Sequence, residues 1–156
     1  SKKISKIIRL LLDKDIDANI LLVAPAQHDE HILLRVAEGL SLPLAKVNNN
    51  SLVGASIIAD SELYLGGRWH GSIFALLNGA RLVNFEANTF KMRGLKDMTN
   101  HPYQIYPSHQ AGDQVDEIGK SIISGLDESS RDDQQKMIKA LQSMSEKNLD
   151  GVRENI

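Results

Sequence analysis

Residues 62–78 pass from a short apolar run through a glycine-rich turn into an apolar helix-like run, and this order constrains the fold more than any other feature. The turn (residues 66–72, the glycine turn) has the sequence Gly-Gly-Arg-Trp-His-Gly-Ser. A glycine-rich connection from a strand into a helix brings backbone N–H groups and the positive helix end close to a ligand. Arg68 adds a permanent cation and His70 a titratable donor, so the turn is typical of a site for a phosphate or a carboxylate.

The same order of elements repeats along the chain. A continuous apolar run predicts a buried strand at residues 20–24, and short runs rich in apolar residues predict a weaker strand at 44–47 and further strands at 62–65, 81–85 and 103–106. Apolar residues at helical spacing predict helices at residues 4–11, 32–40, 52–59, 72–78, 90–98 and 113–125. Strands that alternate with helices predict an α/β fold, here a Rossmann-like three-layer domain with a parallel sheet of about five strands.

Capping residues mark some of these boundaries. The polar residues 48–51 are typical of a helix start, and Thr89 is a candidate cap for the helix that follows it. Gly79 suits the end of the helix after the glycine turn.

We expect residues 1–156 to form one Rossmann-like domain, because the length is about that of one domain and no linker divides the chain. The start at Ser1 rather than at a methionine indicates a trimmed fragment. Residues 127–150 predict a long, mostly solvated helix with Met137, Leu141 and Met144 on one side.

Composition narrows the classes of function. The net charge is −2, from 18 basic and 20 acidic residues, which argues against a general nucleic-acid binder because such domains carry a basic excess. The chain has no cysteine, which excludes disulfides and thiolate metal sites and fits a cytosolic protein. No apolar run approaches the roughly 20 residues that span a membrane.

In an open parallel sheet the ligand lies beyond the carboxyl ends of the strands. The loops at the predicted ends hold most of the polar residues that could do chemistry, and they are residues 24–31, 47–51, 66–72, 86–91 and 107–110. We therefore expect the site at these loops.

Two charged residues follow the fourth predicted strand. Lys91 is either a second cation for a phosphate or an ordinary exposed lysine, and Glu86 is a base, a hydroxyl acceptor or the partner of Lys91. The glycine turn has its own ordinary alternative, in which Arg68 pairs with a surface carboxylate and His70 is a loop histidine. We expect Trp69 to pack or stack beside the ligand.

The segment His28-Asp29-Glu30-His31 contains residue types that bind metals. These residues crowd one turn and lack a third well-spaced partner, so we expect no metal site there. Asp29 and Glu30 also suit the start of a helix, where carboxylates are stabilised by the helix dipole. His109 lies in the last of the candidate loops and could reach the same edge of the sheet.

Residues 59–79 resemble part of the C-terminal half of the polysaccharide pyruvyl transferase family. That family has an aspartate, an apolar strand, a glycine, an Arg-apolar-His sequence and a small residue, followed by an apolar helix, a glycine, a strand and a lysine. The lysine here is Lys91, ahead of Gly94, and the similarity extends over residues 20–106. Two positions depart from the family, since Trp69 stands where leucine is usual and Gly71 where alanine is common.

The resemblance implies a two-domain fold like that of the B-type glycosyltransferases, with this chain as the second domain. It implies an enzyme that transfers pyruvate from phosphoenolpyruvate to two hydroxyls of a sugar as a ketal, in cell-surface polysaccharide synthesis. The acceptor is a sugar or a lipid-linked saccharide, and the location is the cytoplasm or the inner face of the membrane. The glycine-rich N-terminal half of the family is not in these 156 residues, so we do not expect this chain alone to catalyse the full reaction.

On this reading Arg68 and His70 are the catalytic pair. The substrate-binding set is Gly67, Arg68, Trp69, His70, Gly71, Ser72, Glu86 and Lys91, with no cofactor and no metal. Arg68 binds the donor through two parallel hydrogen bonds, and the N–H groups of Gly71 and Ser72 hold a phosphate oxygen. His70 acts as the general acid or else stabilises the departing phosphate, which Lys91 neutralises. The alternatives are a sugar-nucleotide-dependent glycosyltransferase or epimerase domain of the same fold, and a non-catalytic partner domain.

Overall fold

The computed structural model describes residues 2–14, 19–86, 90–99, 104–109, 113–125, 136, 138, 139 and 143. Its helices are α1 (Lys2–Asp13), α2 (Gln27–Leu40), α3 (Ser51–Ala59), α4 (Trp69–Leu77), α5 (Lys91–Thr99) and α6 (Val115–Gly125). Its strands are β1 (Leu22–Ala24), β2 (Leu44–Lys46), β3 (Leu63–Gly66), β4 (Arg81–Phe85) and β5 (Gln104–Tyr106). The predicted alternation of helices and strands is confirmed.

The strands form two parallel sheets rather than the single sheet of about five strands that the sequence predicts. β1 pairs with β2, Leu22 lying opposite Leu44, and β4 lies between β3 and β5, Leu65 lying opposite Val83. Within the described residues no ladder joins the two sheets. The expectation of an α/β fold with parallel strands is correct, and the expectation of one continuous sheet is wrong.

A separate apolar cluster accounts for the small sheet. β1 and β2 have only three residues each, and Leu22 packs with Val36 and Ala37 of α2 and with Ile8 of α1. These strands therefore bury their apolar side chains against two helices, without a ladder to the larger sheet.

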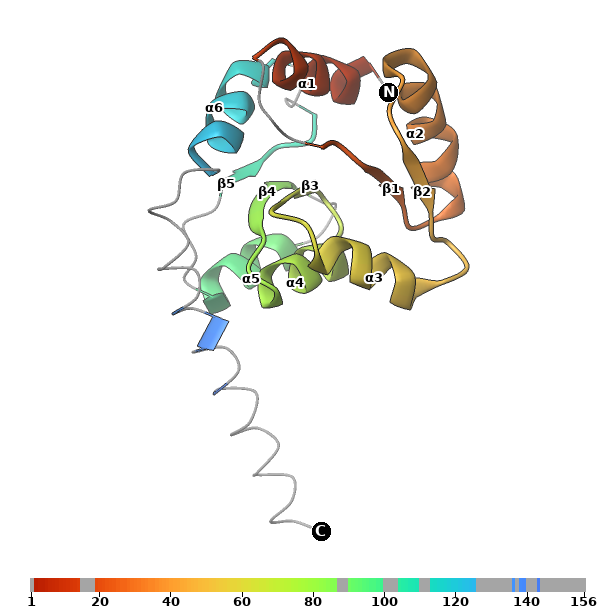
Figure 1. The fold of residues 1–156 in the computed structure, drawn as a ribbon. Coiled ribbons are helices and arrows are strands. Elements are labelled where there is room, and N and C mark those ends of the chain that lie inside the picture. The colour runs from red at the N-terminus through yellow and green to blue at the C-terminus, as the bar shows by residue number, and fades with distance from the viewer. Residues whose placement is uncertain are drawn as a thin grey trace.

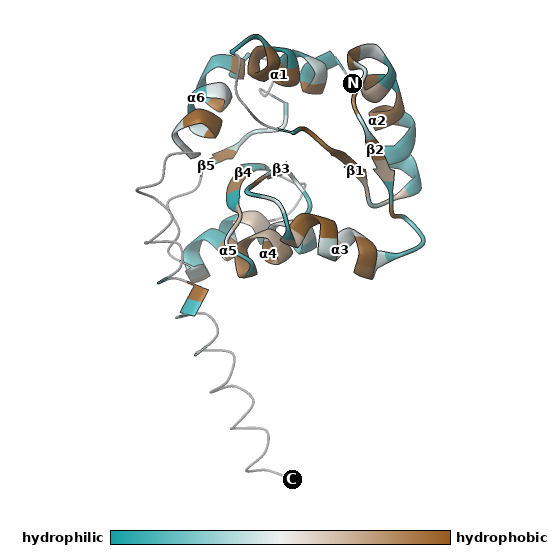
Figure 2. Ribbon diagram, viewed as in Figure 1, coloured by the Kyte–Doolittle hydropathy of each residue, from teal (hydrophilic) through white to brown (hydrophobic). Residues whose placement is uncertain are grey.

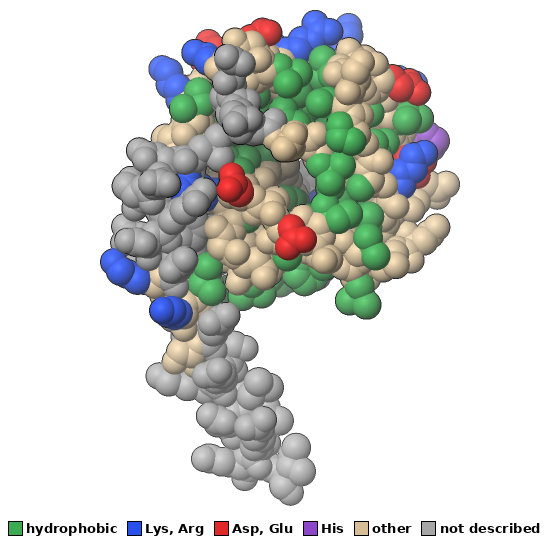
Figure 3. Space-filling view, viewed as in Figure 1, with side chains coloured by type: hydrophobic (Ala, Val, Ile, Leu, Met, Phe, Trp, Pro, Cys, Tyr) green, Lys and Arg blue, Asp and Glu red, His purple; other side chains and the backbone are tan. Residues whose placement is uncertain are grey.

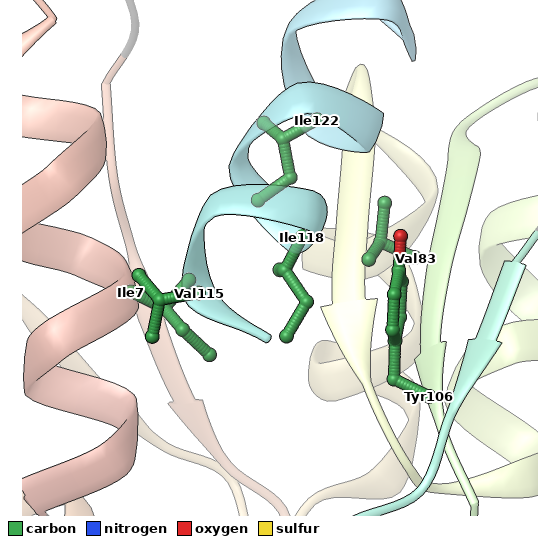
Figure 4. Close-up of a cluster of buried hydrophobic side chains, with 6 residues drawn as sticks. All are labelled: Ile7, Val83, Tyr106, Val115, Ile118 and Ile122. Carbon is green, nitrogen blue, oxygen red and sulfur yellow. The ribbon is translucent and has the colours of Figure 1, made fainter. Parts of the chain in front are cut away.

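Helices cover both faces of the three-stranded sheet (Figure 1). On one face, residues of α1 and α6 form a cluster with the strands, made of Ile7, Val83, Tyr106, Val115, Ile118 and Ile122. Figure 4 shows the α6 side chains of this cluster between α1 and the strands. Because successive strand residues point to opposite faces, Leu82 faces the other way and packs with Leu76 of α4 and Leu95 of α5. The result is a three-layer arrangement around the larger sheet.

Surface chemistry is mixed. Lys and Arg side chains alternate with Asp and Glu on the face in Figure 3, in keeping with the small net charge. Helix α3 is largely apolar (Figure 2), and its Leu52 is 81% exposed. None of the described helices is both long and apolar enough to cross a membrane.

Two predicted caps are confirmed. The side chain of Asn50 accepts a hydrogen bond from the N–H of Val53 at 3.1 Å, at the start of α3. Gly79 follows α4 with a φ of +86°, a conformation that glycine adopts without strain. Thr89 lies outside the described residues, and so does most of the predicted helix at 127–150, of which only residues 136, 138, 139 and 143 are described, all helical.

Two helices begin earlier than their apolar pattern predicts. α2 starts at Gln27 rather than near residue 32, and α4 starts at Trp69 rather than at residue 72. The first turn of a helix is polar when it faces solvent or a ligand, so apolar periodicity does not register it. Both early starts fall at the candidate site.

Candidate functional site

The glycine turn leads from β3 into α4, and its backbone presents the start of that helix. Arg68 is the extended residue before the helix, and no side chain caps it. The N–H of Ser72, which the sequence predicts to hold a phosphate oxygen, donates to the carbonyl of Arg68 at 3.0 Å. The N–H groups of Trp69, His70 and Gly71 precede it, and the first N–H groups of a helix have no carbonyl of their own helix to bond.

Space, rather than backbone conformation, explains two glycines of this turn. Among the described residues Gly79 is the glycine with positive φ, so Gly66, Gly67 and Gly71 have ordinary backbone angles. A Cβ atom on Gly66 or Gly71 would come within 3.0 Å of the Tyr64 hydroxyl. The ring of Tyr64 therefore lies against both ends of the turn.

Tyr64 lies at the candidate site, and the sequence reasoning did not single it out. Burial raises the pKa of its hydroxyl to about 12, although a hydrogen bond from the Arg68 backbone and the positive charge of Arg68 act in the opposite direction. The phenol is therefore neutral at ordinary pH and bonds the backbone beside the turn. The sequence carried one signal for this contact: Tyr64 stands two positions before Gly66, so both residues lie on the same face of the strand.

A second buried contact fixes α4 to β4. The hydroxyl of Ser72 is fully buried and lies 3.0 Å from Oδ1 of Asn84 and 3.1 Å from the carbonyl of Arg68. Asn84 is fully buried as well, and its Nδ2 has no hydrogen-bond partner among the described residues. Ser72 thus acts inside the fold, and its side chain is not placed to touch a ligand.

Arg68 joins the glycine turn to the first turn of α2, which follows β1. Its Nη2 donates to the carboxylate of Asp29 and lies 2.9 Å from Nε2 of His28. The same Nε2 lies 3.3 Å from Oδ1 of Asp29. Two of the predicted loop segments are therefore in contact, and Arg68 forms the ion pair with a carboxylate that the ordinary alternative describes.

Trp69 brings a second cation to the turn. Nζ of Lys91 lies 5.8 Å from the centre of the Trp69 ring, a cation–π distance. The ring of His70 meets Trp69 edge-on, with ring centres 5.2 Å apart and planes at 77°. Trp69 itself packs against the cluster of α4 and β4, as the sequence predicts for a packing residue.

The carboxylates near the site have their own partners. Glu86 pairs with Arg93, not with Lys91, which corrects one of its three predicted roles. Glu30 pairs with Lys46 at 2.6 Å, and both Asp29 and Glu30 lie in the first turn of α2 as predicted. In the part of the chain that the structure describes, Lys91 has no carboxylate partner.

The other histidines lie apart from these contacts. His31 is exposed on α2, and the carbonyl of His109 accepts a hydrogen bond of 2.6 Å from Lys3 of α1. Across the described ranges no group of three or more His, Asp or Glu side chains is placed to hold a metal ion.

Comparison of this chain with protein-family models, with curated proteins and with solved structures finds no match. The function therefore has to be argued from the residues of the glycine turn and their neighbours.

Proposed function

We propose that the glycine turn binds a small anion that carries a carboxylate or a phosphate. The observation that carries the proposal is the pair of cations beside the uncapped start of α4, Arg68 from the turn itself and Lys91 in contact with Trp69. A helix start with free N–H groups favours negative charge, and each added cation strengthens that preference.

The side-chain contacts support a ligand role for both cations. Of the donors of Arg68, only Nη2 has a partner among the described residues, which leaves Nε and Nη1 for a ligand. Lys91 is exposed, and its described contact is with an aromatic face rather than with a carboxylate. A cation without a carboxylate beside a helix start is what phosphate binding requires.

With the resemblance to pyruvyl transferases, we propose phosphoenolpyruvate as the anion and a sugar as the acceptor. His70 would protonate the methylene carbon while a sugar hydroxyl adds to the central carbon and loses its proton. Phosphate then leaves toward Lys91, and a second hydroxyl of the sugar adds to give the ketal and inorganic phosphate. A cytoplasmic enzyme in which an N-terminal domain completes the acceptor site is part of the same proposal.

An amide NMR titration tests the proposal, with phosphoenolpyruvate in one series and a uridine-diphosphate sugar in the other. We expect phosphoenolpyruvate to shift the amides of residues 66–72 and of Lys91. Arg68→Ala should weaken binding by at least about tenfold, the size of one lost charge-assisted hydrogen bond. Arg35→Ala, at an exposed arginine of α2, is the matched control and should bind as the wild type does.

Two results would count against the proposal. Unchanged affinity in Arg68→Ala would remove Arg68 from the site. Shifts with the nucleotide sugar alone would favour the glycosyltransferase or epimerase alternative, in which the turn holds a diphosphate.

A further inference from the structure

The hydrogen bonds of Arg68 limit how it can bind an anion. Nη2 of a guanidinium carries two N–H groups, and here they face two acceptors, the carboxylate of Asp29 and Nε2 of His28. A guanidinium only donates, so Nε2 of His28 must be the acceptor in this contact, and a neutral His28 carries its proton on Nδ1.

Two-point binding of a carboxylate or phosphate needs two N–H groups on one edge of the guanidinium. One such edge is formed by Nη1 and Nη2, and the other by Nε and Nη2. Both edges include Nη2, so a two-point contact requires that Asp29 or His28 give up its hydrogen bond. The two parallel hydrogen bonds predicted from the sequence are therefore incompatible with Arg68 keeping both of these contacts.

His28 is the partner that can withdraw. Its side chain is 74% exposed, whereas that of Asp29 is 22% exposed and forms the charge-assisted bond with Arg68. Protonation converts Nε2 of a histidine from an acceptor into a donor, and Oδ1 of Asp29 already lies 3.3 Å from this atom. A protonated His28 would thus turn from Arg68 to Asp29 and would add a positive charge.

We propose that His28 controls anion binding at Arg68 through its own protonation. Neutral His28 occupies an N–H group that two-point binding needs, and protonated His28 releases it while Asp29 continues to hold the other. Affinity is therefore full where His28 is protonated and lower where His28 is neutral. This inference rests on the proposed anion site and adds a regulation that the resemblance does not imply.

The surroundings of His28 contain few other charges that could act in its place. Among the described residues its contacts are with Asp29 of its own helix and Arg68 before α4. Tyr64 of β3 senses the charges of Arg68 and Asp29 but stays neutral, since burial raises its pKa to about 12. Glu30 of α2 is paired with Lys46 of β2. His70 and Lys91, on α4 and α5, lie near the same turn, so His70 needs a separate control.

Sulfate is the probe for the test, because its charge stays constant over the range in which histidines titrate. We expect wild-type affinity, from an amide NMR titration, to be roughly tenfold higher at about pH 5.5 than at about pH 8, the effect of one charge-assisted hydrogen bond.

Two substitutions of His28 separate the proposal from a general effect of charge. His28→Gln keeps an acceptor but cannot gain a proton, so binding should be weak at both pH values. His28→Ala removes the acceptor, so binding should be tighter than wild type at the higher pH and should change little with pH. His31 is exposed and lies three residues along the same helix, so His31→Gln should keep the wild-type pH dependence of sulfate affinity. His70→Gln should lose only the contribution of His70 itself and should keep the pH dependence that His28 causes.

The outcomes are distinct. At the higher pH, sulfate binding that is tighter than wild type in His28→Ala but weak in His28→Gln supports the proposal. Wild-type pH dependence retained in both His28 variants overturns it, and so does His28→Ala binding more weakly than wild type at the higher pH. Sulfate binding that requires Arg68 but does not depend on pH overturns this inference alone, while no sulfate binding at either pH overturns the proposed function as well.

Discussion

Replacing Gly71 by alanine tests the packing between Tyr64 and the glycine turn. An alanine Cβ at this position would come within 3.0 Å of the Tyr64 hydroxyl, closer than real Cβ atoms approach other heavy atoms. Tyr64 cannot easily retreat, because its half-buried ring packs against the cluster of α4 and β4 and its hydroxyl takes a hydrogen bond from the Arg68 backbone. Either the ring or the first turn of α4 must move.

The expected cost follows from two opposing effects. Overpacking a buried contact costs about 1–3 kcal/mol of unfolding free energy. Alanine in place of glycine within a helix returns up to about 1 kcal/mol. We therefore expect Gly71→Ala to lower the unfolding free energy by about 1–2 kcal/mol, or Tm by about 2–8 °C for a chain of this size, in urea and thermal unfolding. The same change at Gly94, where a Cβ meets no atom within 4 Å, should be neutral or stabilising.

A double-mutant cycle with Tyr64→Phe assigns the cost to the hydroxyl. Phe removes the nearest atom but leaves the ring, so Gly71→Ala should cost less in that background without becoming free. An equal cost in both backgrounds, or no cost in the wild type, would refute the argument that Tyr64 dictates glycine at this position.

Two further predictions concern single residues. The hydroxyl of Tyr64 has a pKa raised to about 12, so above the ordinary value near 10 the unfolded chain loses this proton before the folded one does. Stability should therefore fall by about 2 kcal/mol more in the wild type than in Tyr64→Phe between about pH 9 and about pH 11.5 in urea unfolding, and equal losses would contradict the raised pKa. Asn50→Ala should cost about 1 kcal/mol in the same assay because it removes the cap of α3, whereas Asn50→Asp should retain most of the stability, and a silent Asn50→Ala would show that the cap contributes little.

The elements were predictable because each is encoded locally. β4 matches its prediction to the residue, and its first four residues are all buried, Arg81 and Asn84 included, so the strand is covered on both faces of the sheet. The pairing of strands is not local. Residues 20–24 have a clear strand pattern and residues 44–47 a weaker one, but whether their sheet joins the larger one depends on how α1 and α2 cover it. No periodicity within a strand carries that information.

The location of the candidate site could be predicted from the sequence, but the contacts between its side chains could not. Strand ends and loops indicated that the segments around His28 and Arg68 would meet, because the carboxyl ends of parallel strands lie at common edges. The structure pairs Arg68 with Asp29, and Glu86 with Arg93 rather than with Lys91. Which partners pair depends on how far each side chain reaches from its own segment. Spacing alone does not rank such partners.

Packing explains the glycines of the glycine turn but not its exposed hydrogen-bond donors. Gly66 and Gly71 are needed wherever a tyrosine hydroxyl lies against both ends of the turn, with or without a ligand. The same reasoning gives no account of Arg68, His70 and Lys91, whose side chains are exposed and fill no part of the apolar clusters. An anion at the start of α4 accounts for all three at once, since each can present a hydrogen-bond donor to it. Substituting the glycines should therefore act on stability, and substituting the three donors should act on binding; a binding loss in Gly71→Ala without any loss of stability would break this division.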